Sequence, residues 1–163
     1  MSDLLVKLYE LPPAPALPDG VLIRKPLGPE HGVLGDWVAG HFGAAWASEA
    51  RAALGNRPVS LYMALLAGVP VGFACYDATA RGYFGPIGVL AAAQRQGLGA
   101  GLLSACLADM LAVGYGYAVI GGVGPTDFFR RAVGAVEIPG SSPGLYRGML
   151  KAGSVTVPRA EAD

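Results

Sequence analysis

Charged residues are scarce in this sequence, and neither sign dominates. Of 163 residues, 15% are Asp, Glu, Lys or Arg, and the 12 basic side chains equal the acidic ones in number. A surface that binds nucleic acid or an anionic membrane carries an excess of basic residues. The balance of charge therefore argues against both kinds of partner, and it leaves a small molecule or another protein as the expected ligand.

Cysteine and histidine are also rare. Cys75 and Cys106 both lie within apolar segments, where we expect them to pack as small hydrophobic side chains in a reducing cytoplasm. A nucleophilic role for Cys106 is a lesser alternative, because the sequence around it holds no histidine or cationic residue to lower its pKa. His31 and His41 are too isolated to indicate a metal site, so we expect no metal.

The sequence has no clear targeting or membrane segment. Its opening residues lack the basic start and long apolar run of a secretory signal. Residues 58–76 are uncharged over 19 positions, which is long enough to suggest a membrane span. Gly68 and Pro70 interrupt this run, so two buried strands joined by a turn explain it better. We therefore expect a cytoplasmic protein without a membrane partner.

Apolar residues, in contrast, are abundant. They make up 53% of a chain whose length suits one domain with a real core. With so few charged residues, the apolar surface exceeds what one small core can hide, and the surplus suggests a subunit interface. We expect a homodimer.

Apolar periodicity and turn residues predict an alternation of strands and helices. A strand at 4–9 and a stiff, Pro-rich linker make up a segment 1–20, which precedes a main domain at 21–150 and a fraying tail at 151–163. The predicted helices are two within 29–54, joined near Gly43, a long one at 97–113, and a short one at 125–133. Within the main domain, strands are expected at 21–25, 59–66, 71–76, 81–89, 117–123, 135–138 and 145–150.

The long helix begins in a glycine-rich stretch. Gly97, Gly99 and Gly101 leave successive backbone N–H groups uncovered at a helix N-terminus, where unsatisfied donors and the helix dipole favour an anion such as phosphate. A P-loop is excluded, because no lysine occurs between residues 25 and 151. The dinucleotide-binding fingerprint is excluded as well, since Leu102 stands where it needs Gly or Ala. By itself, the stretch also fits a helix start with no ligand.

The spacing Gln94-x-x-Gly97-x-Gly99 after a strand resembles the acyl-CoA pyrophosphate signature of the GNAT superfamily of N-acyltransferases. The predicted element order over residues 21–150 is similar to the GNAT fold, and FFRRAVGA at 128–135 is similar to the superfamily's second marker. The resemblance, which extends to an uncharacterised bacterial subgroup, implies an α/β (α+β) fold. It has a mixed central sheet with a parallel strand-helix-strand core and flanking helices.

The resemblance also implies acetyl-CoA as co-substrate, with no metal. Its pantetheine arm would lie between two strands that splay apart, and Gly85-Pro86 marks the place, because proline cannot donate to a sheet ladder. Main-chain groups near this point would polarise the acetyl carbonyl. The implied cofactor-binding residues are Ile87, Gly88, Val89, Gln94, Arg95, Gln96, Gly97, Leu98, Gly99, Ala100 and Phe129.

Two departures from the superfamily pattern affect the catalytic residues. Phe129 stands where a tyrosine often serves as general acid, and Gly122 stands where an asparagine often contacts the cofactor. We select Tyr146 as the substitute acid and Tyr83 as the second choice, although each tyrosine could also be an aromatic side chain that only packs in the core. Glu49 is the candidate base ahead of Asp77, although a solvated surface carboxylate explains either one.

Two functions from different classes follow from this resemblance. The first is an N-acetyltransferase that moves acetyl from acetyl-CoA to the primary amine of a small-molecule acceptor by direct attack. The alternative is a non-catalytic acyl-CoA-binding or assembly module on the same fold, which Phe129 favours. Thiol release from acetyl-CoA in the presence of amines separates them.

Overall fold

A mixed sheet forms the centre of the molecule. The computed structural model describes residues 1–122, 124 and 126–151, and within them seven strands pair in the order β2-β3-β4-β5-β6-β1-β7. The pair of β5 and β6 is parallel, and the other neighbours are antiparallel. The expected mixed sheet is confirmed. The strands are β1 Leu4–Lys7, β2 Val21–Arg24, β3 Leu61–Leu66, β4 Val69–Tyr76, β5 Tyr83–Val89, β6 Tyr117–Ile120 and β7 Val136–Glu137.

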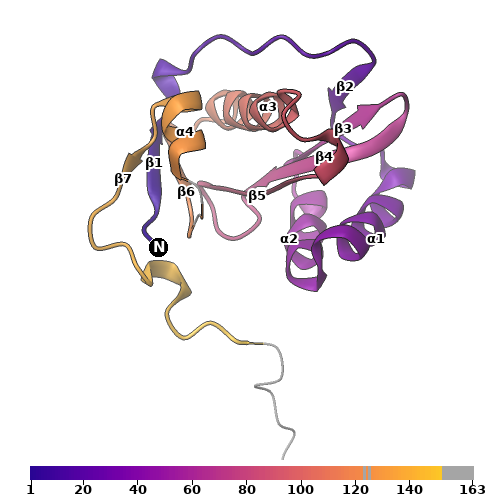
Figure 1. Ribbon diagram of the computed structural model, residues 1–163. Coiled ribbons are helices and arrows are strands. Elements are labelled where there is room, and N and C mark those ends of the chain that lie inside the picture. The colour runs from indigo at the N-terminus through magenta and orange to yellow at the C-terminus, as the bar shows by residue number, and fades with distance from the viewer. Residues whose placement is uncertain (123, 125, 152–163) are drawn as a thin grey trace, which may run out of the picture.

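Helices cover both faces of this sheet. Figure 1 shows α3 and α4 on one face, with α1 and α2 on the other. The α-helices are α1 His31–Phe42, α2 Ala44–Gly55, α3 Leu98–Ala112 and α4 Thr126–Val133. In the part of the chain that the structure describes, four short 3-10 turns complete the list, namely η1 Leu8–Glu10, η2 Gly28–Glu30, η3 Ala91–Ala93 and η4 Gly144–Tyr146.

The side chains of β4 show how the sheet separates two cores. Phe73 and Cys75 join the group of apolar residues under α1 and α2, whereas Ala74 and Tyr76 join the group under α3. This alternation is the period of two that an extended strand imposes. Burial also raises the pKa of the Cys75 thiol far above its ordinary range, which agrees with its predicted packing role.

Helix α3 is buried on more than one side. Leu98, Leu102, Cys106 and Met110 form the apolar face that the periodicity predicts, and all four are buried. The same spacing predicts that Val113 also faces the sheet, but Val113 follows the last residue of α3 and is 45% exposed.

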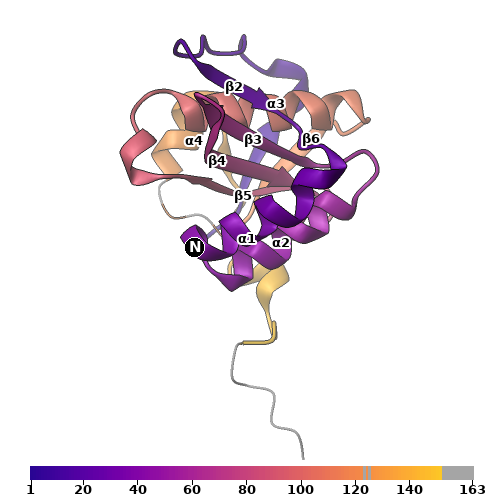
Figure 2. The ribbon, with the colours of Figure 1, turned by 90° about the vertical axis from the view of Figure 1, so that its right-hand side faces the viewer.

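The segment before the main domain is part of the same structure. Strand β1 pairs with β6 on one side and β7 on the other. The Pro-rich segment 11–19 then runs across the outer side of α3 to reach β2 (Figures 1 and 2). Segment 1–20 thus contributes an internal strand to the sheet.

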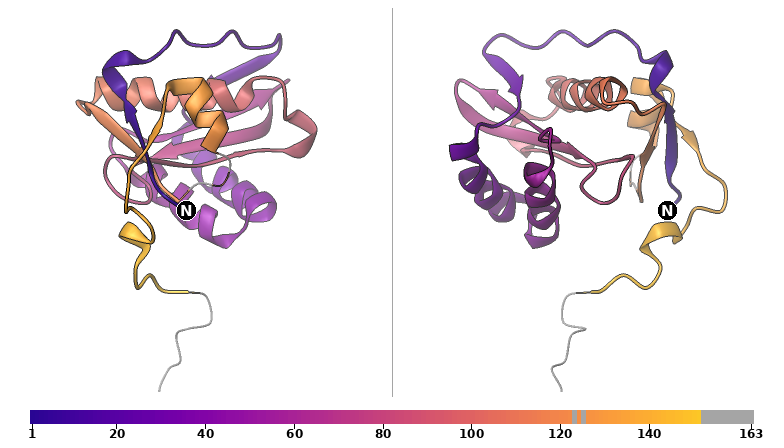
Figure 3. Two further views of the ribbon diagram at one scale, coloured as in Figure 1. Left: turned by 60° about the vertical axis from the view of Figure 1, so that its left-hand side comes forward. Right: turned by 180° about the vertical axis from the view of Figure 1, so that it is seen from behind.

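The expected strand at 145–150 is wrong. Residues 144–146 form η4, and 147–150 form neither helix nor strand. Figure 3 shows this stretch leaving the sheet beyond β7, while β1 lies beside β6. Gly148 has a φ of 73°, a left-handed conformation that breaks an extended strand.

Strand β6 is shorter than expected. It ends at Ile120, two residues before Gly122, and Val123 lies outside the described residues. Pro125, expected to open the short helix, and residues 152–163 of the predicted tail also lie outside them. No helix among the described residues has the length and apolar character needed to cross a membrane.

Candidate active site

The first turn of α3 presents an uncapped N-terminus. Gly97 precedes it with a φ of 81° and offers no side-chain oxygen to the helix, so the N–H groups of Leu98, Gly99 and Ala100 have no intrahelical acceptor. Residues 94–97 are exposed, and Arg95 adds a cationic side chain to the approach. This turn can therefore accept an anion through its main chain.

The three glycines of this stretch have different roles. A methyl group on Gly99 would touch only Phe128, at 3.7 Å from Cζ. Gly101 instead lies under the Pro-rich segment, where a methyl group would come within 2.7 Å of Leu17 Cδ2. Its N–H also donates to the Gly97 carbonyl at 3.0 Å. Gly101 is required for packing, so it does not contribute the free donor that the sequence suggested.

Strands β5 and β6 separate after a short parallel contact. They pair at Tyr83 with Val119 and at Phe84 with Ile120. On its other edge β5 remains paired with β4 as far as Val89, with a register shift at Gly85-Pro86. The separation of two strands that Gly85-Pro86 predicts is confirmed, and we call the region beyond Phe84 the strand divergence. Along it, the main chain of 87–89 has one edge that is not paired with β6.

A side chain links the strand divergence to the start of α3. The amide of Gln94 donates from Nε2 to the Val89 carbonyl at 3.0 Å. The last residue of β5 and the turn that leads into the helix are therefore held together. A ligand that lies along β5 and ends in an anionic group can use both features at once.

Two tyrosines meet at the end of β6. A side chain on Gly121 would overlap the Tyr146 hydroxyl and would lie 3.1 Å from the ring of Tyr83. Burial is the main cause that raises the pKa of Tyr146, and the charges of Asp3 and Glu49 add to it. Burial, followed by Asp3, also raises the pKa of Tyr83. Both phenols are held in their proton-donating form near the strand divergence.

The two candidate carboxylates differ in how they are engaged. Glu49 of α2 is half-buried and accepts one hydrogen bond, from the Thr79 hydroxyl. Asp77 accepts from Tyr115 at 2.9 Å and from the Gly82 N–H at 2.7 Å. Asp77 therefore stabilises the turn before β5, while Glu49 keeps acceptor capacity. Glu49 also lies near enough to Tyr146 to influence its pKa.

Phe129 does not lie where the marker motif suggested. Its side chain is 3% exposed and packs in the main core, with its ring 6.2 Å from that of Phe84. The half-buried Phe128 is the ring that reaches Gly99 in the first turn of α3. This differs from the prediction that Phe129 contacts the cofactor. The reason is the rotation of α4, which turns Phe129 inward.

An aromatic group covers the other face of β5, and the sequence analysis did not predict this role. The Phe42 ring lies so close to Gly88 that a methyl group there would approach its Cε1 to 2.6 Å. Trp46 stacks on Phe42 with ring centroids 5.7 Å apart. A glycine within a strand was the available signal, because it permits close approach of another group. This group places α2, and with it Glu49, over the sheet.

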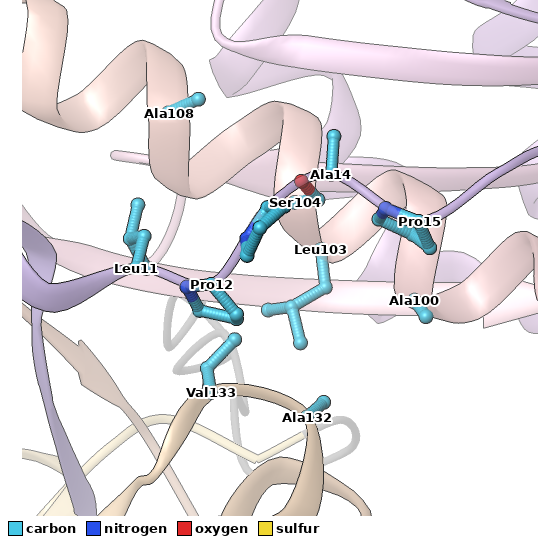
Figure 4. A pocket seen from close by; sticks show the side chains of 11 residues that line it. Leu11, Pro12, Ala14, Pro15, Ala100, Leu103, Ser104, Ala108, Ala132 and Val133 are labelled. Carbon is cyan, nitrogen blue, oxygen red and sulfur yellow. The ribbon is translucent and has the colours of Figure 1, made fainter.

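A separate cavity of about 340 Å³ lies under the Pro-rich segment. Figure 4 shows its lining, which comes from residues 11–15, the outer side of α3, and Ala132 and Val133 at the end of α4. It meets the first turn of α3 at Ala100. None of its lining residues belongs to β5, β6 or the segment of Tyr146, so it is not where the two tyrosines meet.

One comparison with known proteins identifies a family. Residues 33–133 match the model of the acetyltransferase (GNAT) family. No curated protein sequence matches the chain significantly. Among solved structures, a GCN5-related N-acetyltransferase from Sphaerobacter thermophilus has a TM-score of 0.67 at 20% identity, covering 84% of this chain and 48% of that one.

Two further structures show the same fold. A GCN5-related N-acetyltransferase from Kribbella flavida has a TM-score of 0.61 at 25% identity, covering 83% of this chain and 53% of that one. A glucosamine N-acetyltransferase region of a fungal multi-domain β-N-acetylglucosaminidase has a TM-score of 0.66 at 14% identity, covering 84% of this chain and 19% of that one. The chain thus spans about half the length of the two bacterial structures.

Proposed function

The chain belongs to the acetyltransferase (GNAT) family, and from this premise we propose that it transfers acetyl from acetyl-CoA to the primary amine of a small molecule. One observation carries the proposal. The uncapped start of α3 adjoins the strand divergence, and the hydrogen bond from Gln94 to Val89 connects them. An anion site and an unpaired strand edge in this arrangement suit the pyrophosphate and the amide-bearing arm of CoA.

The residues at these two places fit the cofactor. Pyrophosphate would be held by main-chain groups of 94–100, which are exposed or lie in the first helical turn. The pantetheine arm would pair with the free edge of 87–89 as an added strand would. Acetyl-CoA supplies the acetyl group as a thioester, which the protein needs only to bind and orient.

Side chains are needed to transfer protons during the reaction. As the acceptor nitrogen bonds to the acetyl carbon and the bond to sulfur breaks, nitrogen loses one proton and sulfur gains one. Glu49 is our candidate for the group that takes the proton from nitrogen, because one hydrogen bond from Thr79 leaves it acceptor capacity. Tyr146 is our candidate donor to sulfur, because its hydroxyl lies against Gly121 at the end of β6, near the strand divergence. Exchange with solvent restores both.

The proposal is tested by thiol release from acetyl-CoA across a panel of primary amines. Tyr146→Phe should lower turnover by up to the roughly 10²- to 10⁴-fold typical of general acid catalysis. The acetyl-CoA dissociation constant should change little, because a ring of the same shape remains. Tyr117→Phe, at an exposed tyrosine on the far end of β6, is the matched control. Full activity in Tyr146→Phe would eliminate this acid and leave Tyr83 or solvent.

A non-catalytic acyl-CoA-binding module is the second candidate. The observation that favours it concerns Phe128 and Phe129 of α4: Phe128 reaches the first turn of α3 without a hydroxyl, and the ring of Phe129 is buried. Such a module would bind acetyl-CoA with the same residues of α3. Tight binding of acetyl-CoA without acetylation of any amine in the panel would support the module over the enzyme.

A further inference from the structure

Asp3 is a buried carboxylate at the junction of three segments. It immediately precedes β1, and its residue surface is 4% exposed. Its Oδ1 accepts a hydrogen bond from the Gly122 N–H at 2.9 Å, just past the end of β6. Within the described residues, no lysine, arginine or histidine forms an ion pair with Asp3. A carboxylate is costly to bury in such surroundings, which suggests that it has a function.

The main chain of Asp3 holds the segment that carries Tyr146. Its N–H donates to the Ser141 hydroxyl at 2.7 Å, and its carbonyl accepts from the Ile138 N–H at 2.9 Å. Ser141 in turn donates to the Ile138 carbonyl at 2.7 Å. These bonds fix the start of the loop that leads to η4. Asp3 thereby joins the end of β6, through its side chain, to the Tyr146 loop, through its backbone.

We propose that Asp3 is a positioning residue for acetyl transfer, which holds the Tyr146 hydroxyl beside the end of β6. This inference rests on the proposed function for the role of Tyr146 as proton donor. The contact is close, because Gly121 has no room for a side chain between its backbone and that hydroxyl. A shift of either segment would move the donor away from the strand divergence.

The charge of Asp3 has a second consequence for the same hydroxyl. The groups that face Tyr146 are Asp3 before β1, Glu49 of α2 and Tyr83 of β5. A nearby negative charge disfavours the tyrosinate, so Asp3 helps to raise the pKa of Tyr146, after burial. Neutralising Asp3 should therefore lower this pKa. The basic limb of the pH–rate profile, where the proton donor is lost, should move to lower pH.

Two substitutions separate the two contributions of Asp3. Asp3→Asn removes the charge but keeps an oxygen that can accept from the Gly122 N–H, so it should shift the basic limb while retaining most of the turnover. Asp3→Ala removes the charge and also the oxygen that accepts from the Gly122 N–H. The Tyr146 hydroxyl should then be misplaced, which should lower kcat by roughly 10- to 100-fold. Neither should change the dissociation constant for CoA, whose proposed anion site is on α3. Thermal unfolding verifies that each variant is folded.

A double-mutant cycle gives the sharper test. In a protein that carries both Tyr83→Phe and Tyr146→Phe, Asp3→Asn should no longer shift the basic limb, because both hydroxyls whose pKa Asp3 raises are absent. The same shift in that background would overturn the proposal, as would a folded Asp3→Asn variant with an unaltered profile. Unchanged kcat in folded Asp3→Ala would overturn the positioning role.

The assignment can also be decided without turnover. NMR of the protein labelled with ¹³C at tyrosine Cζ follows the titration of Tyr146 directly, and Tyr146→Phe identifies its resonance. Asp3→Asn should lower the pKa of Tyr146, and no change would overturn the inference about Asp3. If the parent acetylates no amine, the proposed function fails, whereas this titration still decides whether Asp3 acts on Tyr146.

Discussion

Gly99→Val tests whether the start of α3 binds the pyrophosphate of CoA. A helical Cβ tilts toward the helix N-terminus, so a valine here would project toward the exposed N–H groups where we place the anion. A single methyl meets only Phe128, at 3.7 Å. A methyl group therefore has space in the free protein, and we expect the branches of valine to obstruct a ligand that approaches the main chain closely.

The expected loss of affinity follows from the hydrogen bonds involved. Each bond from a first-turn N–H to a charged phosphate oxygen contributes about 1.5–3 kcal/mol. Losing one of them raises the CoA dissociation constant about 10- to 100-fold, since about 1.4 kcal/mol corresponds to tenfold. Gly99→Ala should weaken binding less. The fold should not suffer, because replacing a helical glycine removes a penalty of up to about 1 kcal/mol.

Isothermal titration calorimetry with CoA measures the effect, and thermal unfolding verifies the fold. Gly40→Val is the matched control, because Gly40 lies in a helix, is exposed and has no neighbour within 4 Å of a methyl group. It should leave CoA affinity unchanged. If folded Gly99→Val bound CoA as tightly as the parent, the reasoning that places the pyrophosphate on α3 would be refuted.

Four further predictions concern stability and assembly. Gly101→Leu should lower the melting temperature, because a side chain there collides with Leu17 and overpacking costs about 1–3 kcal/mol. Phe129→Tyr should also lower it and should not raise turnover, because the added hydroxyl would be buried. The hydrogen bond from Arg24 holds the pKa of Glu30 at about 2, so calorimetric scans should show that Glu30→Gln destabilises at pH 7 and that the difference fades from about pH 4.5 toward pH 2. Light scattering at micromolar concentration should report a homodimer, and a monomer at every concentration would contradict this inference.

Local sequence patterns predicted the parts of the fold that depend on local physics. The period of α3 identified Leu98, Leu102, Cys106 and Met110 as its buried face, and all four are buried. The pair Gly85-Pro86 predicted an irregular strand, since proline cannot extend a ladder, and the register shift lies there. In both cases the residues that determine the feature are neighbours in the sequence.

The rotation of α4 about its axis and the different roles of the glycines in α3 were harder to predict. A motif aligned by sequence placed Phe129 at the cofactor, but the rotation of α4 brings Phe128 to the first turn of α3 instead. Gly99 and Gly101 are equivalent in the sequence, yet a methyl group at Gly99 would make an ordinary contact with Phe128, whereas one at Gly101 would collide with Leu17. Tertiary contacts decide both questions, and a single sequence carries no direct signal of them.

The largest error was the strand expected at 145–150, where the structure has η4 and no strand. Residues 4–9 and 145–150 are both short and apolar, so composition does not distinguish them. At the start of residues 4–9 buried and more exposed side chains alternate, with Leu4 and Val6 fully buried. Residues 145–150 instead contain Gly148 in a left-handed conformation. Because β1 pairs with β6, Asp3 lies at the end of β6. Residues 145–150 are not part of the sheet, and Tyr146 packs against Gly121. The pairing of β1 with β6 therefore decides which side chains lie at the proposed reaction centre. Because this pairing joins distant parts of the chain, the sequence predicted Tyr146 and Glu49 as site residues but gave no indication of Asp3.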